Sequence, residues 1–525
     1  MDAVRHTGHG RRGTGRRGAV ALLSTCALLA TACASLDAGH APAATRLAPD
    51  GAAPAEAVPP GLARYYGQKL HWKPCADQPS FQCTTLKAPL DYAHPEAGDI
   101  SLAATRMKST GTGAERIGSL LYNPGGPGES AVSGLWGLGP AFSSGVRAAY
   151  DLVAVDPRGV GDSTPVECDA DASAGLPESG PAAVAGLSDF TVLDEEREEI
   201  AETCRLGAGR LLPHVGTPDA ARDMDLMRAL VGDGRLHFLG FSYGTYLGAT
   251  YAELFPSHVG RMVLDGGMDP ALDGYHRMLN SARGYQVAWE SFAADCATRA
   301  DCPVGRSVAE ADRALDALVA DLDRNPLREG KDITFTGDDL LRVVSDALRA
   351  PDWEQLRAGL REAASAGDTV SLQKLSGAAQ EESGSGYEWY TAVSCLSGML
   401  GPRYTPAQTE AALPAFRRAS PQFWTYYIDF LTLCRHWPAG PSQPSHAITA
   451  PGAPPILVVG TTRDPATPYA WSQALARELS SARLLTWDGD GHTAYIQPEG
   501  SACVDNAVDR YLLSGQLPPA GTVCH

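Results

Sequence analysis

One serine in this chain lies in a setting that favours nucleophilic chemistry. Residues 235–239 form a short apolar run bounded by glycine, which is typical of a buried strand. The motif Gly240-Phe241-Ser242-Tyr243-Gly244 follows, and residues 245–255 are expected to form a helix. A G-x-S-x-G pattern between a strand and a helix predicts a nucleophile elbow, a tight turn that exposes the serine hydroxyl. Since an ordinary glycine turn can match this pattern, the rest of the site must support the prediction.

A base and an acid that could activate the serine occur later in the chain. A serine hydroxyl becomes a good nucleophile only when a base removes its proton and an acid orients that base. In proteins with this elbow, the order along the chain is serine, acid, histidine. Asp464 follows an apolar run at 455–459, and His492 lies in a glycine-rich loop after the next such run. We therefore predict Ser242, Asp464 and His492 as the catalytic residues. Asp265 competes for the role of the acid because it ends an earlier strand.

Backbone N–H groups must also stabilise the oxyanion that forms when a serine attacks a carbonyl group. The N–H of Tyr243, directly after the serine, is one expected donor. The second donor is expected from the glycine loop at 123–130, where Gly125 or Gly126 can approach a substrate closely, and Gly126 is preferred. Structural roles only are expected for four other polar residues: Asp156, His237, Asp488 and Asp490.

Short apolar runs that alternate with helical stretches position these motifs. Six runs predict buried strands: residues 119–122, 150–155, 235–239, 261–264, 455–459 and 483–487. Continuous apolar strands separated by helices are typical of a mostly parallel sheet with helices on both faces, so the fold class is α/β. Ligands bind such sheets at the carboxyl ends of the strands, which is where the motifs lie.

The strand pattern stops between the fourth and the fifth of these runs. Helical patterns replace it at residues 307–323, 338–349 and 353–364. A helical insertion at this place predicts a cap over the active site, inserted before the last strands. The expected divisions of the folded part are a core at 61–270, a helical cap at 271–450 and the second part of the core at 451–525.

The composition excludes some partners. The chain of 525 residues has a net charge of −18, which argues against nucleic acid because phosphate binding needs clustered Lys and Arg. No C-x-x-C and no H-E-x-x-H motif occurs, so a zinc site is not expected. We expect no metal and no cofactor.

The N-terminus has the features of an export signal. Arginines precede an apolar run at 19–30 that is too short to assign as a membrane-spanning helix. Residues 29–33, Leu-Ala-Thr-Ala-Cys, resemble a bacterial lipobox, which favours a signal peptide at 1–33 with Cys33 as the lipidated residue. Ordinary cleavage after Ala34 is the alternative. Residues 34–60 are rich in Ala and Pro and are expected to form a tether. Both routes place the protein outside the cytoplasm, anchored to a membrane or secreted.

The cysteines agree with export. Without Cys26 in the signal and Cys33, ten of the twelve cysteines remain, and an even number in an exported chain favours disulfides. Their order suggests that sequence neighbours pair, although other connectivities stay open. The suggested pairs are Cys75–Cys83, Cys168–Cys204, Cys296–Cys302, Cys395–Cys434 and Cys503–Cys524.

Together the motifs resemble those of the secreted bacterial tripeptidyl aminopeptidases and their relatives, near the proline iminopeptidase branch of the α/β-hydrolase serine peptidases. The resemblance runs from about Trp72 to the C-terminus. It is carried by NPGGPG at 123–128, DPRGVGDS at 156–163, GFSYGTYLG at 240–248, LDG at 264–266 with DP at 269–270, DPATP at 464–468, GH at 491–492 and the tail at 503–524.

The resemblance implies an α/β-hydrolase that cleaves peptides from the free N-terminus, with acidic residues of the cap binding the substrate ammonium group. Two departures affect the binding site. Ser397 stands where the family often has an acidic or amide residue, and Glu129 stands where a small residue is usual. Glu129 and Glu388 are the candidate substrate-binding residues. Glu381 and Glu382 are alternatives, and any of these could instead belong to a solvated helix face.

The predicted function is that of an exported serine exopeptidase that releases short peptides or single residues through an acyl-enzyme. An esterase or lipase is the alternative, because fold and catalytic residues do not determine the substrate. A catalytically silent binding protein is a third hypothesis, and the presence of all three catalytic residue types argues against it.

Overall fold

The computed structural model describes residues 58–168, 187–329, 332–366, 372, 386–498 and 500–525. The chain divides into a unit at 1–45 and a unit at 46–525, and every described residue belongs to the second. The expected signal peptide, Cys33 and the tether as far as residue 57 lie outside the described residues, as do Glu381 and Glu382. Among the described helices, none is long and apolar enough to cross a membrane.

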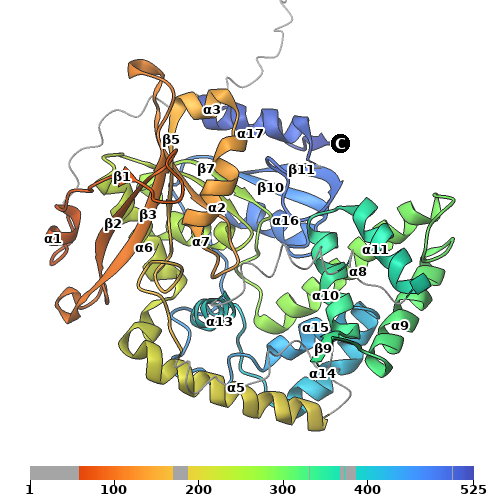
Figure 1. The fold of residues 1–525 in the computed structure, drawn as a ribbon. Coiled ribbons are helices and arrows are strands. Elements are labelled where there is room, and N and C mark those ends of the chain that lie inside the picture. The colour runs from red at the N-terminus through yellow and green to blue at the C-terminus, as the bar shows by residue number, and fades with distance from the viewer. Residues whose placement is uncertain (1–57, 169–186, 330–331, 367–371, 373–385, 499) are drawn as a thin grey trace, which may run out of the picture. The chain divides into compact units, whose positions relative to one another are not determined.

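A ten-stranded mixed sheet forms the core (Figure 1). Its strand order is β1-β2-β3-β5-β4-β6-β7-β10-β11-β12. The parallel strands are β4 (Gly118–Asn123), β5 (Tyr150–Val155), β6 (Leu236–Phe241), β7 (Val259–Asp265), β10 (Ile456–Arg463), β11 (Ala482–Asp490) and β12 (Val523–Cys524). All six strands predicted from the sequence are present, and the predicted α/β class is confirmed.

The sheet also has an antiparallel edge that the sequence analysis missed. It consists of β1 (Lys73–Pro74), β2 (Gln82–Pro89) and β3 (Asp99–Met107), and β3 pairs with β5. In β3, the side chains of Ile100, Leu102 and Ala104 are buried, whereas Ser101 and Ala103 between them are half-buried. Such a strand has a period of two and lacks the continuous apolar run used to find the central strands.

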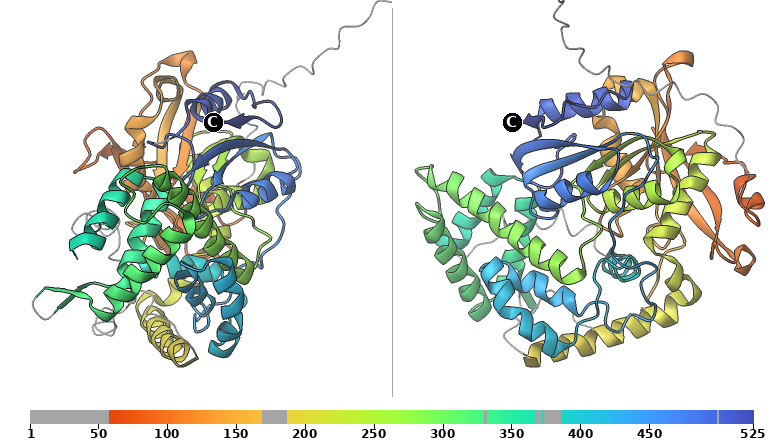
Figure 2. Two further views of the ribbon diagram at one scale, coloured as in Figure 1. Left: turned by 90° about the vertical axis from the view of Figure 1, so that its right-hand side faces the viewer. Right: turned by 180° about the vertical axis from the view of Figure 1, so that it is seen from behind.

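Helices cover both faces of the sheet (Figure 2). One face packs against α2 (Ala131–Leu138), α3 (Ser144–Ala149) and α17 (Ala502–Ser514). The other packs against α6 (Thr217–Leu230), α7 (Tyr243–Leu254) and α16 (Tyr469–Glu478), with α1 (Ala63–Tyr66) beside α6. Each face has its own cluster of buried apolar side chains, because the central strands are apolar on both sides.

A helical cap lies between β7 and β10. It contains α8 (Gly274–Ala297), α9 (Val308–Arg324), α10 (Gly337–Arg349), α11 (Trp353–Ala366), α13 (Gly386–Leu396), α14 (Pro406–Ala419), α15 (Trp424–Ile428) and a hairpin of β8 (Leu327–Glu329) and β9 (Asp332–Phe335). The capping boxes at Thr336 and Thr405 explain where α10 and α14 begin, since each threonine hydroxyl accepts a backbone N–H of the first turn.

Another helix joins the cap from an earlier part of the chain. The helix α5 (Leu187–Ala208) precedes the nucleophile motif and lies within the stretch expected to be core, yet it packs against α14. Arg197 of α5 forms an ion pair with Asp429 at 2.9 Å, and Asp194 pairs with Arg435 at 2.6 Å. These contacts connect the loop after β5 to the far end of the cap.

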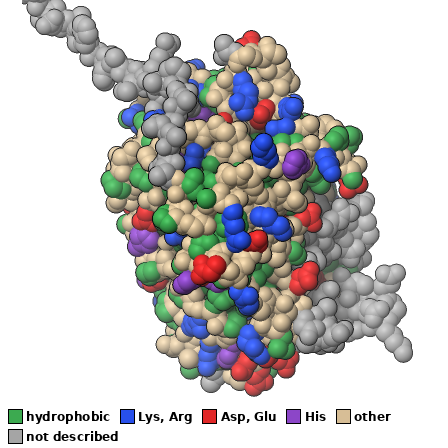
Figure 3. Space-filling view, turned by 90° about the vertical axis from the view of Figure 1, so that its left-hand side faces the viewer, with side chains coloured by type: hydrophobic (Ala, Val, Ile, Leu, Met, Phe, Trp, Pro, Cys, Tyr) green, Lys and Arg blue, Asp and Glu red, His purple; other side chains and the backbone are tan. Residues whose placement is uncertain are grey.

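The surface carries charges of both signs. On the face shown in Figure 3, the Lys and Arg side chains of the described residues are interspersed with Asp and Glu and with apolar side chains. This face therefore has a mixed potential in spite of the net charge of −18.

Five disulfides join the ten cysteines in the order in which they follow one another in the sequence. Two of them fasten the cap. Cys168–Cys204 joins the loop after β5 to α5, and Cys395–Cys434 joins α13 to the segment after α15. Disulfides persist in oxidising compartments, so the structure agrees with a protein that acts outside the cytoplasm.

Replacing both Cys395 and Cys434 by serine should destabilise the cap more than replacing both Cys296 and Cys302. The first disulfide spans 39 residues and the second 6, so the loop-entropy model gives losses of about 4 and about 2 kcal/mol. Thermal unfolding of the two variants, followed by circular dichroism, measures the difference. Equal or reversed losses would contradict the role assigned to the longer crosslink.

Candidate active site

Ser242 lies in the turn between β6 and α7, in a backbone conformation that side chains rarely adopt. Its φ is 54° and its ψ is −121°. The Ser242 N–H donates to the carbonyl of Asp265 on β7 at 2.9 Å, and the Thr245 hydroxyl donates to the Ser242 carbonyl at 2.6 Å. The glycines on both sides are required, since a Cβ at position 240 would lie 2.4 Å from the carbonyl oxygen of Gly244. This is the nucleophile elbow expected from the motif.

The glycine loop after β4 lies directly against the elbow. A Cβ added to Gly125 would lie 2.9 Å from the Cβ of Ser242 and 3.1 Å from the backbone nitrogen of Tyr243. The Gly125 N–H already donates to the Asn123 side chain at 3.1 Å. The Tyr243 N–H is the first of α7 and therefore has no acceptor within the helix. This arrangement favours the Gly126 and Tyr243 amides over Gly125 as oxyanion donors.

Asp464 and His492 are brought together at the carboxyl ends of β10 and β11. The Nδ1 atom of His492 lies 2.9 Å and 3.0 Å from the two carboxylate oxygens of Asp464. Asp464 also accepts the backbone N–H groups of Ala466, Thr467 and Thr493, and its side chain is inaccessible to solvent. These backbone N–H groups hold the carboxylate in place, so that it can orient the imidazole.

The second nitrogen of His492 is unused in this arrangement. Its Nε2 atom is buried and has no hydrogen-bond partner among the described residues. A histidine whose Nδ1 is bonded to a carboxylate presents Nε2 as the atom that can accept a proton. Nε2 is thus the ring nitrogen that remains available to accept a proton.

Asp265, the competing acid, has a different role. Its carboxylate accepts the backbone N–H groups of Ala494 and Tyr495 at 3.0 and 2.8 Å, just beyond His492. Burial in the protein interior, with a smaller contribution from the nearby Asp464 carboxylate, raises the pKa of Asp265 to about 6. The structure places Asp464, and not Asp265, against the imidazole.

The residues expected to be structural are engaged in local contacts. Asp156 accepts the Ser130 hydroxyl and the Val132 N–H, which fixes the end of the glycine loop. Asp488 and Asp490 both pair with Arg463 at 2.8 Å. His237 accepts the backbone N–H of Arg261 within the sheet.

Two cavities lie beside these residues. The first, about 180 Å³, is lined by Gly126, Ser242, Ala466 and Thr467 of the core together with side chains of the cap. The second, about 250 Å³, is lined by His492, its neighbours and residues 349–352 of the cap. Ser242 lines the first cavity and His492 the second, and Arg349 belongs to the wall of both.

The cap contacts the histidine loop directly. The backbone N–H of His492 donates to the carbonyl of Arg349 at 2.8 Å. A Cβ at Gly491, whose φ is +101°, would lie 2.7 Å from Pro351. The position of the imidazole therefore depends on the end of α10 as well as on Asp464.

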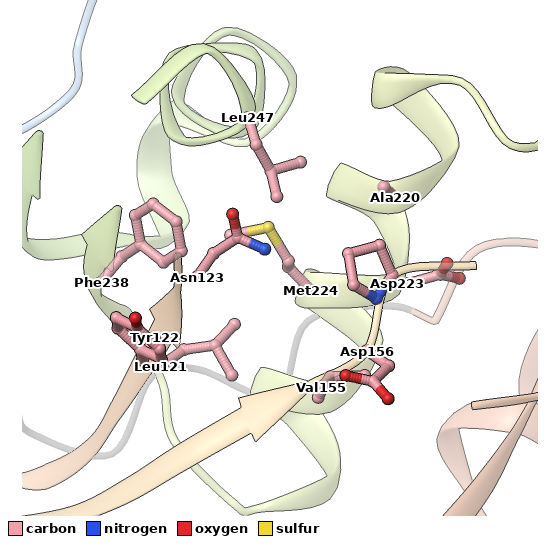
Figure 4. A pocket seen from close by; sticks show the side chains of 11 residues that line it. Leu121, Tyr122, Asn123, Val155, Asp156, Ala220, Asp223, Met224, Phe238 and Leu247 are labelled. Atoms are coloured by element: carbon pink, nitrogen blue, oxygen red, sulfur yellow. The ribbon is translucent and has the colours of Figure 1, made fainter. Parts of the chain in front are cut away.

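A smaller cavity lies away from the chemistry (Figure 4). Its volume is about 20 Å³, and it lies between the sheet and the helices α6 and α7. Its wall includes Leu121, Phe238, Met224 and Leu247. This volume holds about one water molecule. Ser242 does not line it, so it is not the substrate cavity.

The two predicted substrate-binding glutamates lie outside the cavity wall at Ser242. Glu129 is half-buried, and its charge helps to raise the pKa of Arg349. Glu388 of α13 is also half-buried, and burial raises its pKa although the Cys168 N–H donates to it. Ser397, noted above as a departure, hydrogen-bonds to the Thr217 hydroxyl, which contacts the phenol of Tyr243 at 2.8 Å.

The fold and the site define the class of protein. A mostly parallel sheet with a serine in the turn after a central strand, and an Asp–His pair at the ends of the strands beyond it, is a serine hydrolase of the α/β-hydrolase fold.

Comparison with known proteins identifies the family. The chain is 35% identical to the serine protease Hip1 of Mycobacterium tuberculosis over 486 residues, which cover 87% of this chain and 91% of the relative. It is 34% identical to carboxylesterase B of the same species, covering 84% and 86% of the two chains. It is 33% identical to the tripeptidyl aminopeptidase of Streptomyces lividans, covering 87% and 86%. The family model described as TAP-like protein matches residues 420–524. The chain belongs to the tripeptidyl aminopeptidase-like family of serine hydrolases.

The variant Asp464→Asn should lower kcat by about three to four orders of magnitude, because the amide can hold the imidazole in the wrong tautomer. The matched variant Asp265→Asn should keep kcat within about tenfold of the parent, since an amide oxygen can accept the same backbone N–H groups. Turnover of a chromogenic peptide by both variants decides the assignment. A larger loss from Asp265→Asn would reverse it.

Asp265 should also make stability depend on pH. Its folded pKa, about 6, lies above the ordinary value of 3.8, so the folded state binds the proton more tightly. The proton on Asp265 therefore stabilises the folded state. This stabilisation, about 3 kcal/mol in total, is present below pH 4 and is lost as the pH rises to about 6. Urea unfolding at pH 4 to 7 should show Asp265→Asn gaining stability over the parent across this window. A constant difference would contradict the shifted pKa.

Proposed function

We propose that this protein is an exported serine exopeptidase that releases short peptides or single residues from the free N-terminus of peptides. One observation carries the catalytic part of the proposal. His492 is held at Nδ1 by Asp464 while its buried Nε2 has no partner among the described residues, and both residues end strands on the same side of β6, whose elbow carries Ser242.

In the proposed reaction, Ser242 Oγ attacks the scissile carbonyl and His492 Nε2 takes the hydroxyl proton. The N–H groups of Tyr243 and Gly126 stabilise the tetrahedral oxyanion. The intermediate collapses when His492 gives its proton to the leaving amine, which leaves an acyl group on the serine. Water, deprotonated by the same histidine, attacks the acyl-enzyme and releases the acid.

The exopeptidase part of the proposal rests on the names of two similar proteins. Two of the family members are named as a serine protease and a tripeptidyl aminopeptidase, and their similarity extends over most of each chain. A relative named carboxylesterase B keeps the esterase alternative open. A peptide bond is the harder substrate, so an enzyme that cleaves it can also cleave activated esters, and ester turnover alone cannot distinguish the two.

An ammonium group at the substrate N-terminus would need a carboxylate near the end of the bound chain. Glu129 follows the glycine loop and Glu388 lies on α13, which that loop contacts through Gly128. We assign the ammonium to one of these two residues. Membrane attachment through Cys33 belongs to the same proposal, since it would keep the enzyme at the cell surface.

Free and acetylated versions of one peptide test the exopeptidase proposal. A free N-terminus should raise kcat/KM at least about tenfold over the acetylated peptide, because acetylation removes the charge that Glu129 or Glu388 binds. Equal rates on both peptides would favour an endopeptidase or an esterase.

A second experiment tests the serine mechanism. The variant Ser242→Ala should lower turnover at least about 10³-fold. Near-parental activity of this variant would exclude the serine mechanism.

A further inference from the structure

The wall of the cavity beside Ser242 includes three residues whose side chains can donate hydrogen bonds that no described residue accepts. Arg277 of α8, Ser394 of α13 and Trp471 of α16 all belong to its wall. The Arg277 Nη1, Ser394 Oγ and Trp471 Nε1 atoms are buried, and none has a hydrogen-bond partner among the described residues. Buried polar atoms without a partner are rare, and three in one wall indicate a missing ligand.

The charge on Arg277 has no carboxylate bonded to it. This side chain is 2% exposed. Its Nε donates to the carbonyl of Met399 at 3.3 Å, and its Nη2 donates to the carbonyls of Asp269 and Leu272 at 2.9 and 3.1 Å. These are neutral acceptors, and burial lowers the pKa of Arg277, which shows that nearby charges do not fully offset its desolvation. A guanidinium stays protonated in spite of such a shift.

No Asp or Glu is among the described residues that line this cavity, whereas a second arginine, Arg349, is. Arg349 lies near the Tyr285 phenol and near two carboxylates, Glu129 and Asp346, and all three raise its pKa. Arg277 therefore contributes the larger uncompensated charge. An anion in the cavity would supply both the missing charge and an acceptor for the unpaired donors.

The position of the cavity assigns it to the acyl half of the substrate. His492, which gives its proton to the leaving group, lines the other cavity and not this one. The wall here contains Ser242 and Gly126, which contact the scissile carbonyl in the proposed reaction. The part of the substrate that stays bonded to the serine is thus the part that faces Arg277.

We propose that this cavity is an anion-binding subsite, in which Arg277, with Ser394 and Trp471, receives the carboxylate of an acidic side chain on the acyl side of the scissile bond. An ionised carboxylate only accepts hydrogen bonds, so it can accept from the guanidinium, the indole N–H and the serine hydroxyl. The amide of Gln or Asn would direct its own N–H groups at them. The substrates are peptides with Glu or Asp among the last residues before the cut. This inference rests on the proposed function only in using hydrolysis at Ser242 as its readout.

The first experiment needs only the parent protein. Peptides with a free N-terminus carry Glu or the isosteric Gln at each of the three positions before the scissile bond, and mass spectrometry measures kcat/KM. At one position the Glu peptide should be cleaved at least about tenfold faster than the Gln peptide, a difference of about 1.4 kcal/mol. Equal or slower cleavage of the Glu peptide at all three positions would overturn the proposal.

The C-terminal carboxyl group of the peptide is a second possible anion, so each peptide is also made with a C-terminal amide. If the preference for Glu disappeared with the terminal carboxyl, the cavity would bind that group, and the proposal of an acidic side chain would be overturned.

Variants test the named donors. Arg277→Met should reduce the Glu-to-Gln ratio to about one, and Arg277→Lys should keep part of it because the charge remains. Ser394→Ala removes one donor with little change of shape, and Trp471→Phe removes one donor while it keeps an aromatic ring. Each should lower the ratio severalfold even if Arg277→Met does not fold. Arg361→Met is the control, since Arg361 lies on the cap surface and pairs with Asp301. A ratio unchanged by Ser394→Ala, Trp471→Phe and Arg277→Lys would overturn the assignment.

A binding measurement separates this proposal from the proposed function. If Ser242→Ala retained parental activity, hydrolysis at Ser242 would be excluded, but calorimetry could still compare a Glu tripeptide with its Gln isostere on that variant. Tighter binding of the Glu tripeptide would support the anion subsite on its own. Equal binding would overturn the subsite whatever the fate of the serine mechanism.

Discussion

The strained backbone at Ser242 is the constraint from which the rest of the site follows. A positive φ at a residue with a side chain costs about 1 to 3 kcal/mol and persists only where its surroundings hold it. Here the N–H of Ser242 is held by the carbonyl of Asp265, and its carbonyl by Thr245. The flanking glycines allow β6 and α7 to meet closely enough to form the turn. The hydroxyl is thereby fixed at the carboxyl edge of the sheet, and the acid and the base must come from the strands that end at the same edge.

Two carboxylates on neighbouring strands hold different parts of the loop that carries His492. Asp464 at the end of β10 bonds to the imidazole, while Asp265 at the end of β7 bonds to the backbone after it. Both are buried, but their environments differ. Asp464 accepts several N–H groups and faces the histidine, whereas one oxygen of Asp265 has no partner among the described residues. The hydrogen bonds therefore compensate the burial of the carboxylate better at Asp464 than at Asp265.

Sequence reasoning found the central strands and the loops that end them, because continuous apolar runs and glycine motifs are local signals. It left the choice between Asp464 and Asp265 open, since both end strands and only the fold shows which one the histidine meets. The edge strands β2 and β3 were missed because they alternate, and α5 was not assigned to the cap because its partner α14 lies about two hundred residues further along the chain. No sequence pattern indicated a role for Arg277. A single arginine on an amphipathic helix is usually exposed, and its burial depends on carbonyls of three separate residues.

The cap contributes to the chemistry as well as to selection of the substrate. Its residue Arg349 accepts the N–H of His492, and the backbone of α13 lies so close to Gly128 that a Cβ there would be 2.7 Å from the Tyr390 nitrogen. The cap thus contacts both the histidine loop and the glycine loop that carries the expected oxyanion donor. A cap that moved as a free lid would disturb both loops each time it opened. The nucleophile turn, in contrast, is held by Asp265 and Thr245, which both belong to the core. The segment that supplies the arginines of the cavity beside Ser242 therefore also contacts both loops that carry the expected catalytic groups.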